Sequence, residues 1–132
     1  MTRLTVLLIV VAISQFVLGA FTLLAPGPFF HWMGLTPPPP DNGYIIGMLA
    51  ARFIAYGIGM TALARAERPD PFWIRNMALI QAIDFAVGAF YVSSGTIAFA
   101  VAAFPMFNAL VFGALLWFWT PRAPQPAANR PV

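Results

Sequence analysis

IRNMALIQAIDFAVGAFYV, residues 74–92, is long enough to cross a lipid bilayer as a helix, yet it carries a carboxylate near its middle. At 1.5 Å per residue the stretch rises about 28 Å, close to the roughly 30 Å thickness of a hydrocarbon core. An ionisable side chain at such a depth is energetically unfavourable. Asp84 is therefore a functional hypothesis whose partner has to be found.

The composition of the whole chain indicates an integral membrane protein. Of its 132 residues, 61% are hydrophobic and 8% are charged, against about 45–50% and about 25% in soluble domains. The net charge of +3 comes from arginines that flank apolar segments, where they act as topology signals, so nucleic acid is not an expected partner. The absence of cysteine excludes disulfides, thiolate metal sites and cysteine catalysis. We predict no metal site and no cofactor.

Four apolar segments predict an all-α fold, a four-helix transmembrane bundle formed by one domain at residues 1–120. The expected helices are residues 4–24, 45–64, 74–92 and 97–119. The first segment is longer than the roughly 7–15-residue core of a signal peptide, so we expect it to stay in the mature protein. Residues 121–132 are rich in Pro and Ala and predict a disordered cytoplasmic tail.

The loop after the first helix is aromatic and then proline-rich. Phe29, Phe30 and Trp32 belong to a patch too short to span a bilayer, which predicts a short amphipathic segment at the membrane interface. The prolines at residues 37–40 favour a stiff polyproline II segment. We interpret His31, the single histidine, as a polar tip on this patch rather than as a metal or haem ligand.

Small residues recur at every fourth position of the second helix, a pattern that lets membrane helices approach closely. We therefore predict that one face of this helix is a packing face. Its members are Gly43, Gly47, Ala51, Ala55 and Gly59.

The arginines predict the orientation. All of them except Arg52 fall on one side of the predicted bundle, while the loops around residues 25–44 and 93–96 contain no Lys or Arg. The arginines on that side are Arg3, Arg65, Arg68, Arg75, Arg122 and Arg130. By the positive-inside rule both termini should be cytoplasmic.

The intramembrane charges lie at matching depths. Arg52 is about 10 Å and Asp84 about 12 Å below the outer ends of their helices, which a short connection makes antiparallel. We predict a buried ion pair between them, with polar side chains from the other helices offsetting its desolvation. The further members of this predicted polar cluster are Gln15, Gln81, Asn108, Tyr56 and Tyr91.

Three roles stay open for the cluster: fixing the register of the helices, binding a ligand or substrate, and conducting protons or ions. A duplicated helical hairpin is a further interpretation, because QFVLGAF at residues 15–21 and DFAVGAF at residues 84–90 have identical residues at four equivalent positions. Such a duplication would form a parallel repeat about the membrane normal.

The outer loop reads P-x-P-F-F-x-x-x-G-L before its prolines, and the second helix reads A-x-R-F-x-x-x-G around Arg52. These patterns resemble small bacterial membrane proteins of the DoxX-like group, especially its four-helix relatives. The resemblance implies a bacterial inner-membrane location and an accessory role near respiratory or redox systems. It identifies no catalytic residue.

We expect a non-enzymatic protein of the lipid bilayer, either an accessory subunit of a larger membrane complex or a homo-oligomer. The alternative is a binder or carrier of a small lipophilic molecule such as a quinone, held in a pocket around Arg52 and Asp84. An enzyme using Asp84 as acid or base is the least favoured interpretation, because no His, Cys or metal cluster accompanies it.

Overall fold

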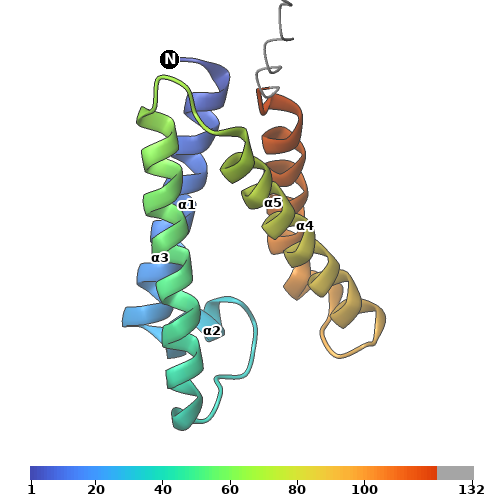
Figure 1. Ribbon diagram of the computed structural model, residues 1–132. Coiled ribbons are helices and arrows are strands. Elements are labelled where there is room, and N and C mark those ends of the chain that lie inside the picture. The colour runs from blue at the N-terminus through green and yellow to red at the C-terminus, as the bar shows by residue number, and fades with distance from the viewer. Residues whose placement is uncertain (122–132) are drawn as a thin grey trace, which may run out of the picture.

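The computed structural model describes residues 1–121, which form helices and no strand (Figure 1). The helices are α1 (Arg3–Leu24), α2 (Pro26–Trp32), α3 (Gly43–Arg65), α4 (Pro71–Ser93) and α5 (Phe99–Trp119), with a 3₁₀ turn, η1 (Pro40–Asn42), before α3. As the sequence predicts, α1, α3, α4 and α5 are long and apolar enough to cross a membrane. The predicted disordered tail lies, from residue 122 onward, outside the described residues.

Local sequence sets where these helices begin and end. The Asp70 carboxylate accepts a hydrogen bond from the backbone N–H of Phe72 at 2.9 Å, and Pro71 occupies the first helical position of α4. For this reason α4 begins before residue 74, the predicted start. Gly34 and Gly95 adopt positive φ angles of 74° and 71° after α2 and α4, a conformation that glycine adopts without strain.

Glycines bring the long helices together in two antiparallel pairs, α1 with α3 and α4 with α5. A Cβ added to Gly19 would lie 2.8 Å from Ile54 Cγ1 and 3.2 Å from the Ala50 carbonyl oxygen. A Cβ on Gly88 would lie 2.7 Å from Met106 Cγ. Only a residue without a side chain allows this approach, so each pair is a closely packed hairpin.

The predicted packing face of α3 is wrong for contacts within the chain. A Cβ added to Gly47 or Gly59 would meet no atom within 4 Å. Instead, α3 meets α1 through a different face, where a Cβ on Gly57 would lie 2.9 Å from the Phe16 ring. The regular spacing of small residues did not identify which face of α3 is buried.

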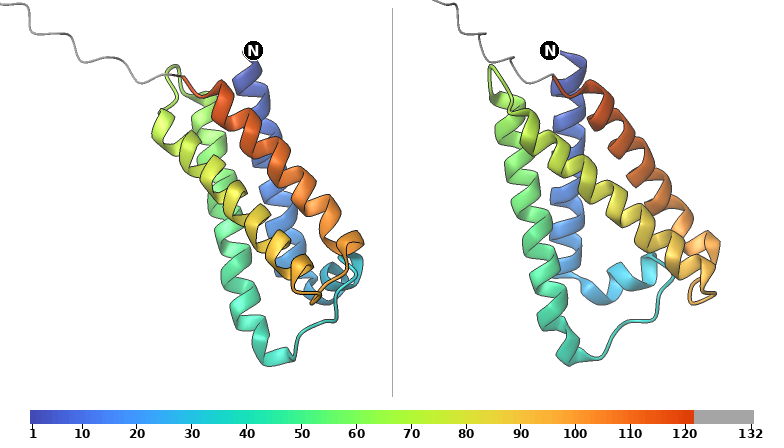
Figure 2. Two further views of the ribbon diagram at one scale, coloured as in Figure 1. Left: turned by 90° about the vertical axis from the view of Figure 1, so that its right-hand side faces the viewer. Right: turned by 45° about the vertical axis from the view of Figure 1, so that its right-hand side comes forward.

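The two hairpins meet at the end of the molecule that holds the N-terminus and the α3–α4 connection. The core there joins Leu8 and Val11 of α1 to Met60 of α3, Met77 of α4 and Leu116 of α5. Helix α1 contacts α5 directly, whereas α3 and α4 diverge away from this end (Figures 1 and 2). Away from their connection α3 and α4 therefore do not pack on each other, and the region between the diverging helices is called the α3–α4 opening.

Helix α2 connects the hairpins at their far end. The Trp32 ring centroid lies 6.0 Å from that of Phe21 on α1 and 6.4 Å from that of Phe104 on α5. The right-hand view of Figure 2 shows α2 across the wide end of the space between the hairpins. A helix thus occupies the position of the predicted amphipathic segment, and its location at a membrane interface stays a prediction.

We predict that Gly19→Ala destabilises the protein by about 1–3 kcal/mol, because its methyl group would push α1 away from α3. Thermal unfolding of the detergent-solubilised protein measures the change. Gly59→Ala is the matched control and should cause no loss, since its methyl group meets open space. Equal loss in both variants would contradict the glycine contact between α1 and α3.

Candidate functional site

The predicted buried ion pair between Arg52 and Asp84 is not formed. Within residues 1–121 no salt bridge joins the two side chains, and both are exposed. The physical reason is the pairing of the helices: α3 packs on α1 and α4 packs on α5, so that α3 and α4 separate at the level of the two charges. The positions of Arg52 and Asp84 in the sequence predict their depth along each helix, but not the distance between α3 and α4.

The two charges nevertheless lie on opposite sides of the opening between α3 and α4. Tyr56 and Met77 line a groove between these helices. Arg52 lies one helical turn from Tyr56, and Asp84 lies two turns from Met77, so each shares a face with the groove residue of its own helix. Both charges therefore border the same opening, beyond the end of the groove.

The groove between α3 and α4 has a volume of about 490 Å³. Its walls are mostly apolar; most of its polar residues gather at the α3–α4 connection, while Tyr56 lies toward its other end. The residues that line it are Ala55, Tyr56, Gly59, Met60, Ala62, Leu63, Ala66, Arg68, Asp70, Trp73, Asn76 and Met77.

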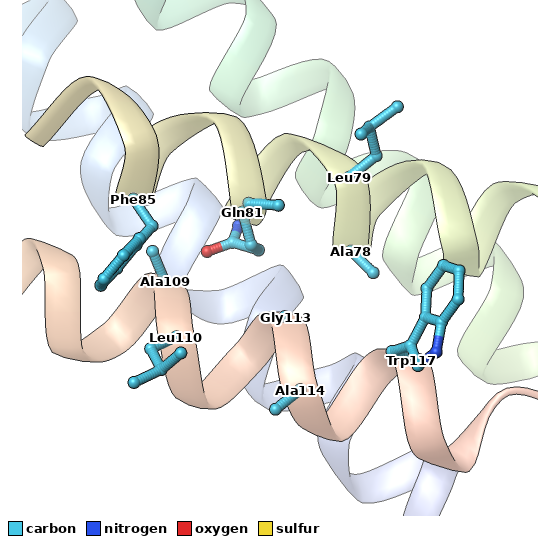
Figure 3. Close-up of a pocket in the computed structure, with 10 residues that line it drawn as sticks. Ala78, Leu79, Gln81, Phe85, Ala109, Leu110, Gly113, Ala114 and Trp117 are labelled. Carbon is cyan, nitrogen blue, oxygen red and sulfur yellow. The ribbon is translucent and has the colours of Figure 1, made fainter. Parts of the chain in front are cut away.

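Gln81 lies in a second groove, of about 370 Å³, between α4 and α5. Figure 3 shows its amide on the side of α4 that faces Gly113 of α5, among alanine side chains. The side chain is 5% exposed, and its Nε2 atom donates to the Met77 sulfur at 3.8 Å, a weak acceptor. Gln81 thus belongs to the α4–α5 contact, away from Arg52.

The buried polar groups of α1 form a separate stripe. Gln15 is 6% exposed, and Thr22, seven residues further along the same face, is 1% exposed. The Thr22 hydroxyl is buried without a hydrogen-bond partner in the described residues. Thr22 is not among the residues predicted from the sequence, although its spacing of two turns from Gln15 places it on the same face of α1.

The remaining predicted site residues are further apart. Asn108 is half-buried on α5, and Tyr56 is half-buried against the core. Tyr91 is exposed at the far end of α4, where its ring packs edge-on against Phe90 at 5.5 Å. In the part of the chain that the structure describes, no hydrogen bond joins two of the seven predicted residues. Tyr56 lines the α3–α4 groove and Gln81 lines the α4–α5 groove, and the seven residues do not form one cluster.

The described side chains offer no centre for metal chemistry, since no three His, Cys, Asp or Glu residues among them could share an ion. Comparisons with protein-family models, curated proteins and solved structures found no match for this chain. The exposed charges and the two grooves are therefore the features of this chain that bear on function.

We predict that Thr22→Val stabilises the protein by about 1 kcal/mol, because valine keeps the shape of threonine and removes an unsatisfied buried hydroxyl. Equilibrium unfolding in detergent measures this gain. In Thr61 the hydroxyl donates to the Gly57 carbonyl oxygen at 2.8 Å, so Thr61→Val should bring no comparable gain. A destabilised Thr22→Val protein would show that this hydroxyl has a partner in solution.

Proposed function

We propose that the chain is a non-enzymatic, multi-pass protein of the bacterial inner membrane that works within an assembly. One observation carries this proposal: Arg52 and Asp84 lie on helices of membrane-spanning length and are left exposed by the packing of the chain on itself. A charged side chain facing hydrocarbon is unfavourable by about 2.5–3.5 kcal/mol on insertion scales. A second protein that covers both charges removes this penalty.

The covering surface needs an anionic and a cationic group at one membrane level. A second copy of the chain carries both, and a two-fold axis along the membrane normal would form Arg52–Asp84 pairs twice in one interface. A larger complex with equivalent charges on its own helices would serve equally. The DoxX-like sequence patterns support an accessory role in such a complex.

The alternative, a pocket for a quinone-like molecule around Arg52 and Asp84, has less support. Neither residue lines the two grooves described above. The faces of α3 and α4 that carry Arg52 and Asp84 are open and oppositely charged, which suits contact with another protein. A small ligand needs a site that encloses most of its surface.

We predict that Arg52→Asp and Asp84→Arg each release the protein from its assembly, because each places like charges across the interface. Crosslinking in native membranes, followed by size measurement, detects the release. When the two variants are co-expressed, opposite charges face each other again, so dimers should return to about the wild-type level.

Arg65→Leu is the control, since it removes an exposed arginine from the end of α3 rather than from its middle. Assembly that survives both single charge reversals would overturn the proposal. Release without rescue by co-expression identifies a different protein as the partner.

The proposed topology places the α4–α5 loop outside and the α3–α4 loop inside the cell. The chain has no cysteine, so Ser94→Cys and Glu67→Cys each introduce one unique label at an exposed loop position. A membrane-impermeant maleimide added to intact cells should label Ser94→Cys, and Glu67→Cys only after permeabilisation. The reverse pattern would refute the cytoplasmic placement of both termini.

A further inference from the structure

The groove between α3 and α4 has an apolar body as deep as one leaflet of a bilayer. From Ala66 to Ala55 its α3 wall extends about 16 Å, half of the roughly 30 Å hydrocarbon core. Gly59 lies in this wall, and a Cβ added to it would meet no atom within 4 Å. The groove volume of about 490 Å³ falls within the roughly 300–1,000 Å³ of small-molecule sites. These dimensions fit an extended alkyl chain.

The shallow end of the groove is polar and supplies hydrogen-bond donors. Arg68, Trp73 and Asn76 line it, with guanidinium, indole and amide N–H groups. Arg68 forms no ion pair within residues 1–121. The one carboxylate of the groove, Asp70, caps α4 by accepting a hydrogen bond from the backbone N–H of Phe72 at 2.9 Å, and within the described part of the chain it bonds to none of these donors. Donors without an internal acceptor fit an anion.

Charge around this end favours the same ligand. Arg65 and Arg75 flank the α3–α4 connection, and with Arg68, Glu67 and Asp70 they give residues 65–75 a net charge of +1. If the helices cross a bilayer, this end lies at the level of lipid headgroups. Clustered arginines at that level attract anionic lipids.

We propose that the groove between α3 and α4 binds one anionic phospholipid, with its phosphate at Arg68 and Asn76 and an acyl chain along Gly59 and Ala55. The headgroup supplies the acceptor that the donors need, and the chain covers the apolar wall. This inference depends on the proposed membrane location but not on the proposed assembly. Arg52 and Asp84 lie beyond the groove, and the test below leaves both unchanged.

Native mass spectrometry of the purified full-length protein in detergent tests the site with two probes that have identical chains, dimyristoyl phosphatidylglycerol and dimyristoyl phosphatidylcholine. The first phosphatidylglycerol should bind more tightly than the first phosphatidylcholine. Arg68→Gln should weaken phosphatidylglycerol binding about fivefold, the contribution of one arginine near an anionic headgroup, and weaken phosphatidylcholine binding less, because the choline cation offsets the charge of its phosphate. Gly59→Leu should weaken both, because its side chain fills the groove.

Two matched controls separate this site from general attraction to lipid. Arg3→Gln removes an arginine at the same end, and Gly47→Leu adds the same side chain to α3 where a Cβ also meets open space; neither residue lines the groove. Both controls should bind lipid as the wild type does. Equal loss in Arg68→Gln and Arg3→Gln would overturn the site, and so would unchanged binding by Gly59→Leu. Circular dichroism confirms that each variant is folded.

Discussion

Close contact between helices at glycines is the constraint on which the rest of the structure depends. Gly19 lets α1 approach the backbone of α3, and Gly88 gives the Met106 side chain its place between α4 and α5. Inside a bilayer, lipid is as apolar as leucine, so helices associate where close packing gains most dispersion energy. These contacts select two hairpins in which α3 and α4 are not partners, although they are consecutive in the chain.

The surfaces available for function follow from this selection. Because α3 uses one face for α1, its opposite face remains free, and this free face carries Arg52 above the groove and Gly59 within it. Helix α4 likewise turns Gln81 towards α5 and leaves Asp84 exposed. The exposed charges, the α3–α4 groove and the opening therefore all follow from the pairing of α1 with α3 and of α4 with α5. They lie along the same side of the molecule.

The sequence predicts the four long helices well, because length and hydropathy alone determine which segments can cross a bilayer. The sequence does not predict which of these helices pack against each other. Gly57 and Gly59 are two positions apart and so point to nearly opposite sides of α3, yet only Gly57 is enclosed by a neighbouring helix. In a helix that is apolar on all sides, no periodicity distinguishes the two. Depth along a helix can be counted, and so Arg52 and Asp84 were placed at one level, whereas lateral distance depends on the pairing.

The aromatic contacts of α2 have a mechanical consequence. The hairpins are joined by the chain at one end, through the short α3–α4 connection, and at the other end by Trp32 between Phe21 and Phe104. The shared core at the connected end and the Trp32 contacts at the other end together set the angle between the two hairpins. The glycine contacts lie within each hairpin, so the contacts that hold a hairpin together are separate from those that set the angle between the hairpins.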